Sequence, residues 1–258
     1  MSFFDQTRPL VFAHRGGSAL GPENTIAAFD LGMQAGADGL ELDVHLSADG
    51  IPVVHHDATL DRTTPVQGEI AGRTVAELAR IDAGYHFGDR GTYPFRHQGV
   101  GIPALSDVLA RYPGVRIIVE MKVDSREMGE AVAQAVRAAG AADRVCAAGY
   151  GWHSAAAARA ALPEMARSAC HSEVRLAVYR TLARWRIRRP RYGGYQVPEM
   201  NGARRIVSPR FIRDAHQEGL RVHVWTVDHE RDMRRLLDWG VDGLISNRPD
   251  LAVRVRNG

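Results

Sequence analysis

The stretch GLELDVHLSADGIPVVHHD, residues 39–57, contains two β-type runs separated by a very short turn. The runs are Gly39–Leu46 and Pro52–His55, and the turn Ser47–Gly50 reads Ser-Ala-Asp-Gly. A connection of this length is far too short for a parallel crossover, so the two runs must form an antiparallel hairpin. The hairpin decides the fold, because it shows that one of the expected strands does not belong to the parallel sheet.

Elsewhere, β-type runs alternate with amphipathic helical stretches, which predicts parallel strand pairing. Nine strands are expected, and setting aside the return strand of the hairpin leaves eight, the number in a TIM-type (β/α)8 barrel. An open doubly wound sheet is the alternative, but no GxGxxG or Walker motif supports it. The expected strands are Leu10–Ala13, Gly39–Leu46, Pro52–His55, Arg116–Met121, Val145–Ala148, Ala166–Ala169, Tyr195–Val197, Val222–Thr226 and Gly243–Ser246. The expected helices are Asn24–Ala35, Arg126–Ala139, His153–Leu162, Pro209–Glu218 and Glu230–Trp239.

The chain length fits one such barrel. It has 258 residues, and a single α/β barrel uses about 250. No stretch of sequence reads as a linker, so we predict one domain over residues 1–258. Residues 57–105 are rich in Thr, Gly and Arg and only weakly periodic, which indicates a small insertion over one mouth of the barrel.

Composition excludes several other classes of protein. The chain is 45% hydrophobic and 24% charged, with a net charge of +3, so it is neither disordered nor basic enough to predict nucleic-acid binding. Cys146 and Cys170 lie outside any CxxC or Cys/His cluster, which argues against a disulfide scaffold or structural zinc. The N-terminus lacks the features of a signal peptide and no apolar run is long enough to span a membrane. We therefore expect a cytoplasmic protein.

The first expected strand ends in the sequence His14-Arg15-Gly16-Gly17. A strand that runs into a Gly-rich turn places a titratable base and a fixed cation at the mouth of the barrel, where backbone amides can approach an anion. A loop with an incidental His and Arg is the alternative for a motif this short.

The second strand carries Glu41, Asp43 and His45 on one face, because side chains alternate along a strand. The apolar residues between them would face the helices, so the two carboxylates would point into the barrel. Buried carboxylates need positive compensation, and oxygen ligands suit Mg²⁺ or Ca²⁺. A structural pair held by Arg or Lys is the alternative.

The return strand ends in His55-His56-Asp57. If the hairpin folds symmetrically about Ser47–Gly50, the numbers of facing residues sum to about 97. His56 then lies opposite Glu41, and Val54 lies opposite Asp43. This prediction depends on the register, because a slip of one residue would exchange His55 and His56.

A third acidic position lies in the later strand, where Glu120 and Lys122 share a face near the strand end. Catalytic groups of barrels gather at that end. Glu120 could complete a three-carboxylate metal site, and Lys122 could bind a phosphate oxygen. A simple salt bridge is the alternative for an isolated Glu-x-Lys pair.

Together these motifs resemble those of the glycerophosphodiester phosphodiesterases. The resemblance runs in order along nearly the whole chain, and its joint spacing is specific. The matching pieces are HRG at 14–16, PENT at 22–25, ELDVHLSADGIPVVHHD at 41–57, LDRTT at 60–64, IPALSDVL at 102–109, VEMK at 119–122, VHVWTVD at 222–228 and DGLISNRPD at 242–250. Asp228 and Ser106 depart from the residues common in the family.

The resemblance implies a TIM-type barrel with a small insertion after the hairpin, and it implies roles for individual residues. Metal ligands would be Glu41, Asp43 and Glu120, holding one divalent cation, Mg²⁺ or Ca²⁺. The acid–base pair would be His14 and His56, while Arg15 and Lys122 would bind the phosphate. Trp225 would form an apolar wall beside the glycerol moiety.

The activity expected from this resemblance is metal-dependent hydrolysis of small glycerophosphodiesters to glycerol 3-phosphate and an alcohol. Lysophospholipase D-type activity and a non-catalytic lipid-binding barrel are the alternatives. The first of these alternatives gains support from the basic segment 176–192, where Val178, Leu182 and Trp185 form an apolar stripe flanked by arginines. That stripe predicts either peripheral contact with an anionic membrane or a solvated lid. Oligomeric state is not predicted.

Overall fold

The computed structural model describes residues 3–89, 91–183 and 190–258. Its centre is a ring of parallel strands in the order β6-β5-β4-β2-β1-β11-β10-β7. The ring closes where Ser168, just after β6, bridges to Gly194 of β7. The strands are β1 (Leu10–His14), β2 (Gly39–Leu46), β4 (Arg116–Met121), β5 (Val145–Gly149), β6 (Ala166–Arg167), β7 (Gly194–Pro198), β10 (Arg221–Trp225) and β11 (Gly243–Ser246). The predicted TIM-type barrel is confirmed, and the return strand β3 (Pro52–Val54) pairs antiparallel with β2 and lies outside the ring.

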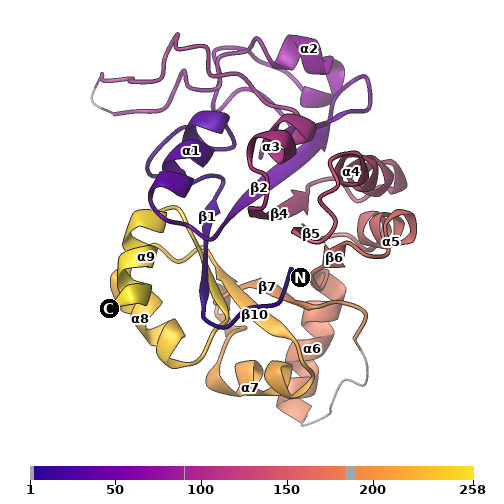
Figure 1. Cartoon of the computed structure of the whole chain (residues 1–258), viewed down its shortest axis with the longest axis vertical. Helices are drawn as coiled ribbons and strands as arrows, with labels where there is room; N and C mark the ends of the chain where they lie inside the picture. The colour runs from indigo at the N-terminus through magenta and orange to yellow at the C-terminus, as the bar shows by residue number, and fades with distance from the viewer. Residues whose placement is uncertain (1–2, 90, 184–189) are drawn as a thin grey trace.

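Helices surround this ring on the outside (Figure 1). Side chains that accept backbone hydrogen bonds begin several of them, as Thr25 does for α1, Ser125 for α4 and Ser208 for α7. The barrel helices are α1 (Ile26–Gln34), α3 (Leu105–Arg111), α4 (Arg126–Ala138), α5 (Trp152–Ala161), α6 (His171–Ala183), α7 (Pro209–Gln217), α8 (Glu230–Asp238) and α9 (Pro249–Asn257). No helix within the described residues is long and apolar enough to cross a membrane.

Alternation along the strands separates two kinds of core. Leu40, Leu42 and Val44 of β2 face outward and pack with the helices in one of two large apolar clusters. Inside the barrel, Phe12 and Ile118 belong to a smaller cluster, which the N-terminal Phe3 joins from below the strands. The interior is therefore filled at its base mainly by apolar side chains, and the charged side chains that point inward gather at the mouth.

The register of the β2–β3 hairpin differs from the prediction. Val44 pairs with Val54 and His45 with Val53, so facing numbers sum to 98 and Glu41 does not face His56. The reason lies in the turn. The Ser47 amide bonds to the Ile51 carbonyl, which leaves three residues in the loop, and Gly50 adopts a left-handed φ of 75°. The symmetric four-residue turn assumed from the sequence was wrong.

The segment between β3 and α3 has a small apolar cluster of its own. It contains η1 (Ile70–Gly72), α2 (Val75–Leu78) and the buried Leu60. It lies to one side of the barrel, above β2 in the view of Figure 1. A further hairpin, β8 (Met200–Asn201) with β9 (Arg204–Arg205), extends from β7 and was not predicted.

The apolar stripe predicted within 176–192 is corrected at its first member. Val178 of α6 is only 7% exposed and packs in the core, so it is not on a face that could meet a membrane. The side chain of Leu182 and the residues Trp185, Arg186, Arg188 and Arg189 lie outside the described part of the chain.

Candidate active site

Three carboxylates converge at the mouth of the barrel. Glu41 and Asp43 come from β2, and Glu120 is paired in register with Asp43 on the adjacent β4. One oxygen from each carboxylate lies within 4.8 Å of the others. Burial, followed by the charges of Asp43 and Glu120, raises the pKa of Glu41 well above its usual value. A cluster of oxygen donors this close is suited to a hard divalent cation, which would offset the repulsion among them.

Two cations flank the carboxylates. Lys122 Nζ lies 3.2 Å from Asp43 Oδ1 and 3.0 Å from Glu120 Oε1. Burial alone would lower the pKa of Lys122, but the two carboxylates outweigh it and the pKa is raised. Arg15 Nε is 3.3 Å from Asp43 Oδ2, and this buried atom makes no hydrogen bond to any described residue. Lys122 is therefore charged, and both side chains face the carboxylate cluster.

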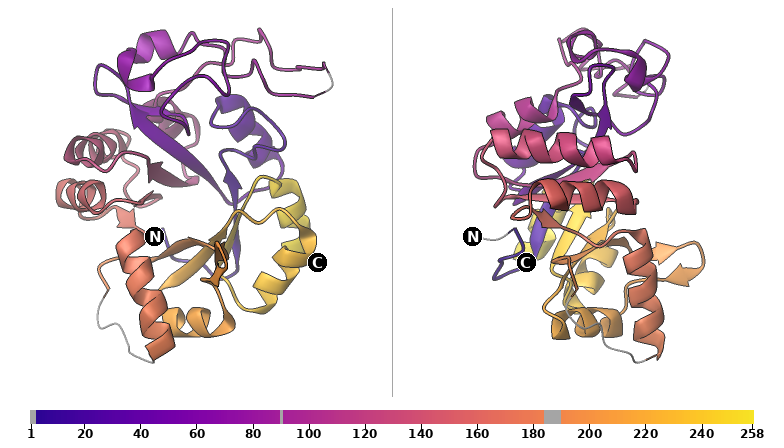
Figure 2. Two further views of the ribbon diagram at one scale, coloured as in Figure 1. Left: turned by 180° about the vertical axis from the view of Figure 1, so that it is seen from behind. Right: turned by 90° about the vertical axis from the view of Figure 1, so that its right-hand side faces the viewer.

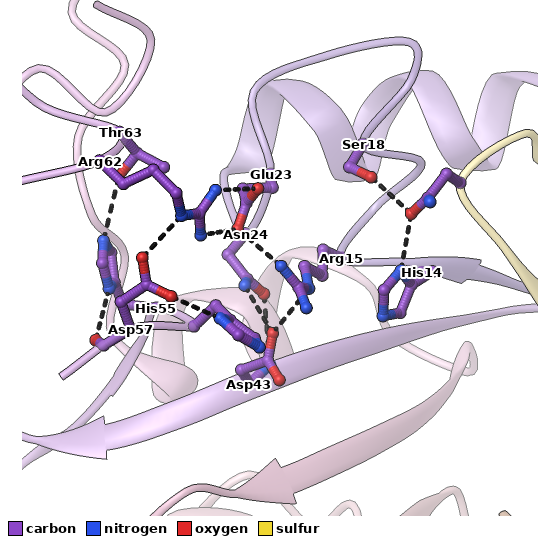
Figure 3. Close-up of polar contacts among 12 residues, drawn as sticks. His14, Arg15, Ser18, Glu23, Asn24, Asp43, His55, Asp57, Arg62 and Thr63 are labelled. Carbon is purple, nitrogen blue, oxygen red and sulfur yellow. Dashed lines mark hydrogen bonds and ion pairs between the residues drawn. The ribbon is translucent and has the colours of Figure 1, made fainter. Parts of the chain in front are cut away.

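His14 is the last residue of β1, and its ring is oriented by a chain of polar partners (Figure 3). Its Nδ1 lies 2.6 Å from Asn247 Oδ1, which also accepts a hydrogen bond from the Ser18 hydroxyl. The Asn247 amide nitrogen donates to Asp228 Oδ2 at 2.7 Å, which fixes Oδ1 as the atom that faces His14. His14 Nδ1 must then carry the proton, and Nε2, 3.8 Å from Glu41 Oε2, has the free lone pair. Burial is the main cause of a lowered pKa for His14.

His56 is oriented by charged partners. Its Nδ1 lies 2.6 Å from Asp57 Oδ1, and Arg62 Nε donates to the other oxygen of Asp57 at 2.6 Å. Arg62 also donates to Glu23 through both terminal nitrogens, at 2.8 and 2.7 Å. Burial would raise the pKa of Asp57, but the hydrogen bonds from Arg62 and His56 outweigh it and lower the pKa. Figure 3 shows this network running from Asp57 through Arg62 to Glu23.

The turn after β1 supports the same network. Asn24 Nδ2 donates to Asp43 Oδ2 at 2.8 Å, while Asn24 Oδ1 accepts from the Asp43 amide at 3.2 Å. Glu23 Oε1 accepts from Arg15 at 3.0 Å. Arg15 and Asn24 both have positive φ, at 50° and 59°, and the Arg15 amide donates to Glu41 Oε2. This turn thus holds both Arg15 and the metal-ligand candidates.

His45 and His55 take structural positions on either side of His56. His45 Nε2 contacts the His56 carbonyl at 3.0 Å, and His55 Nδ1 contacts the Asp57 carbonyl at 2.9 Å. Burial lowers the pKa of both rings. The slipped register did not exchange His55 and His56, because β3 ends at Val54 and alternation no longer governs the chain beyond it.

All eight residues that the sequence singled out line one cavity of about 310 Å³. The cavity has a charged half and a neutral half. The charged half contains His14, Arg15, Glu41, Asp43, His56, Glu120 and Lys122, from β1, β2, β4 and the end of the hairpin. The neutral half includes Ala148, Tyr150, Ser168, His171, Val174, Gln196, Pro198 and Trp225, with no Asp, Glu, Lys or Arg among its described lining residues.

Sequence reasoning did not assign roles to the partners that orient the two histidines and Asp43. These are Ser18, Glu23, Asn24, Asp57, Arg62, Asp228 and Asn247. Most of them lie inside the matching motifs, such as Asn24 in PENT and Asn247 in DGLISNRPD. Their presence in the motifs could have marked them as functional residues. Their roles could not be assigned, because many of the residues that they contact lie far away in the sequence.

Comparisons with known proteins agree with this site. Residues 14–251 match the model of the glycerophosphoryl diester phosphodiesterase family. A glycerophosphodiester phosphodiesterase of Caldanaerobacter subterraneus is 32% identical, over 97% of this chain and 99% of that protein. The crystal structure of a glycerophosphodiester phosphodiesterase from Agrobacterium tumefaciens has a TM-score of 0.77 at 29% identity, covering 97% of this chain and 100% of that one.

A phosphodiesterase from Oleispira antarctica, solved in complex with the product sn-glycerol-3-phosphate, has a TM-score of 0.75 at 26% identity and covers 97% of this chain and 98% of that one. The barrel, with its acidic cluster at the mouth, is that of a phosphodiester hydrolase. The chain belongs to the glycerophosphoryl diester phosphodiesterase family. The predicted enzyme class is thereby confirmed in preference to a non-catalytic barrel.

Proposed function

We propose that the protein hydrolyses glycerophosphodiesters to glycerol 3-phosphate and an alcohol with the help of one divalent cation and two histidines. The observation that carries this proposal is the convergence of three carboxylates, two cations and two oriented histidines on one cavity. The activity named for the Caldanaerobacter relative and the product bound by the Oleispira enzyme support the same substrate class.

The donor set fits a metal ion. Glu41, Asp43 and Glu120 would hold it, and all three donors are hard oxygens within a few ångströms of one another. When bound, such an ion would supply electrostatic stabilisation for the negative charge that develops on the oxygens around phosphorus. Mg²⁺ and Ca²⁺ both accept this donor set.

Arg15 and Lys122 would bind and orient the anionic phosphodiester. Both are fixed by the carboxylates rather than free to reach solvent, so their charges face the cavity before substrate enters. Preorganised charge of this kind stabilises the transition state without reorganisation during the reaction.

His14 and His56 are suited to transfer protons at two positions. In His14 the Nε2 lone pair faces the cavity, so it can accept the proton of the nucleophile. His56, oriented by Asp57, would protonate the departing alkoxide. The nucleophile is either the neighbouring glycerol hydroxyl, through a cyclic phosphate, or water. Trapping a cyclic phosphate by ³¹P NMR during turnover distinguishes the two routes.

A lysophospholipid is the second candidate substrate. The neutral half of the cavity, with Val174, Pro198 and Trp225, offers no charged partner but does offer apolar surface. An acyl-bearing glycerol is compatible with such a surface, whereas a free amino group would find no carboxylate there.

The test is release of glycerol 3-phosphate from glycerophosphocholine and glycerophosphoethanolamine by protein dialysed against EDTA and then reloaded with Mg²⁺ or Ca²⁺. We expect turnover only after reloading. Full turnover in EDTA would refute the metal site, and no turnover under any metal would refute the substrate class. Lysophosphatidylcholine, assayed for choline release, tests the second candidate.

A further inference from the structure

Exposed apolar side chains continue outward from the neutral half of the cavity. Three segments that contribute a cavity-lining residue also carry a large apolar side chain on the surface a few positions away. These segments are the β5–α5 junction, α6 and the connection from β7 into β8. Their exposed members are Tyr150, Trp152, Leu176, Tyr179 and Met200, which are 41–65% exposed. We call these five residues the apolar collar.

The collar accounts for most of the large exposed apolar side chains that the structure describes. It contains five of the eight large apolar residues that are exposed in the described part of the chain. Exposed apolar residues scattered singly need no explanation, but a group gathered beside a cavity mouth indicates a contact surface.

Side-chain contacts join the segments of the collar to one another. The Tyr150 ring stacks on His171 at the start of α6, with centroids 5.1 Å apart and planes inclined by 20°. Further along α6, Arg204 of β9 lies over the Tyr179 ring, 5.6 Å from its centroid. In the right-hand view of Figure 2 the β8–β9 hairpin projects beyond the neighbouring helices. Met200 is therefore carried on a protruding element.

The charges beside the collar are positive. Arg175 and Arg204 are exposed and form no ion pair with any described residue, although Arg204 contacts the Tyr179 hydroxyl. The acidic residues next to these segments already have partners: Glu173 pairs with Arg167 at 2.7 Å and Glu199 with Arg235 at 2.6 Å, while Asp124 accepts hydrogen bonds from His153 and the Ser154 amide. The exposed charges of this surface that have no ion-pair partner among the described residues thus include two arginines.

We propose that the apolar collar, with Arg175 and Arg204, docks the protein on an anionic phospholipid surface. Aromatic and long aliphatic side chains beside unpaired arginines suit the boundary between lipid headgroups and acyl chains. The collar borders the cavity, so docking brings the cavity mouth to the headgroup layer. This proposal replaces the stripe predicted within 176–192, because Val178 faces the core. It goes beyond the proposed function, since binding requires no turnover.

Co-sedimentation of the whole protein with vesicles tests the proposal. Vesicles of phosphatidylcholine with about 30 mol% phosphatidylglycerol are compared with vesicles of phosphatidylcholine alone, because the negative surface potential of anionic lipids attracts basic residues. We expect binding to the first, weakened by added salt, and little binding to the second. The absence of binding to anionic vesicles overturns the proposal.

Two variants locate the surface. The triple variant Leu176→Ser, Tyr179→Ser, Met200→Ser should lose most vesicle binding. The double variant Arg175→Gln, Arg204→Gln should lose roughly fivefold in partition coefficient for each arginine removed. None of the residues changed in these two variants lines the cavity. Hydrolysis of water-soluble glycerophosphocholine should therefore be unchanged in both.

Matched controls change the same residue types elsewhere. Ile51→Ser with Tyr93→Ser removes two exposed apolar side chains outside the collar, and Arg213→Gln removes an exposed arginine of α7. Control variants should bind vesicles as the parent does. If they lose binding equally, or if the collar variants keep it, the proposal is wrong. A parent dimer that the triple variant dissociates, without vesicle binding by the parent, would reassign the collar to self-association.

Discussion

The two halves of the barrel mouth are built from the same kind of strand but are held in opposite ways. On the charged half, each inward-facing side chain has a partner: Asp43 contacts Asn24, Arg15 and Lys122. On the neutral half, Tyr150 is 65% exposed, and its ring stacks on that of His171. Groups that act on the phosphate must be preorganised, whereas a surface that receives a variable alcohol or acyl group needs only shape and apolar area.

The largest effect is expected on the charged half. His56→Ala should reduce kcat about 10²- to 10⁴-fold, because a positioned proton donor is lost. Glycerol 3-phosphate release from glycerophosphocholine measures this, with circular dichroism to show that the barrel is intact. His97→Ala, which removes an exposed histidine of the segment after β3, is the control and should keep full activity. Full activity in His56→Ala would eliminate it as the general acid.

A smaller loss of activity is expected on changing Asn247, which acts on the reaction only through His14. Asn247→Ala should lower kcat about 100-fold with little change in KM, because His14 loses the partner that fixes its ring. The hydrogen bond that His14 donates to Asn247 Oδ1 raises the pKa of His14, so its removal should move the acidic limb of the kcat/KM profile to lower pH. An unchanged profile, with only reduced thermal stability, would mean that Asn247 serves the fold and not the histidine.

Below the neutral half, β10 carries His223 into the base of the barrel. Burial among Phe3, Phe4 and Phe12 lowers its pKa to about 4, with Asp242 opposing and Arg221 and Arg116 adding to the shift. The unfolded chain binds this proton below about pH 6.5, whereas the folded protein does so only near pH 4. The stability gained from neutral His223 is therefore present above pH 6.5 and lost as the pH falls towards 4.

Between pH 7.5 and pH 5 this contribution amounts to about 2 kcal/mol of unfolding free energy. Urea titrations measure the unfolding free energy at the two pH values. Its decrease from pH 7.5 to pH 5 should be smaller by about 2 kcal/mol in His223→Gln than in the parent. Equal drops in both proteins would show that His223 is not the titrating group. Activity at pH 7.5 serves as the control that the mouth is unaffected.

The smallest effect is expected on the neutral half. Trp225→Leu should raise KM for glycerophosphocholine about fivefold and leave kcat nearly unchanged, because an apolar wall contributes binding in ground state and transition state alike. A large fall in kcat would show that Trp225 positions the reacting groups, and the contrast between the halves would need revision.

Much of this contrast was predictable from sequence, because it follows from local rules. Alternation along β2 put Glu41 and Asp43 on one face, and the short turn after Leu46 excluded a ninth parallel strand. The position of His56 at the site was predicted from a hairpin register that is wrong by one residue. The error did not exchange His55 and His56, because β3 ends at Val54 and the two histidines lie beyond the paired strand. Turn geometry depends on which residue takes the left-handed conformation, and in the structure that residue is Gly50.

The sequence by itself determined the strand count, the parallel barrel and the residue types at the mouth, because periodicity and chain length act within a few neighbouring residues. Only the tertiary structure decided which distant partners orient those residues. Asn247 meets His14 across 233 positions, and Arg62 meets Glu23 across 39. Such contacts form when strands close into a ring and bring their ends together. The same closure left Val178 in the core and Tyr179 on the surface, which the pattern of apolar residues along the helix did not distinguish.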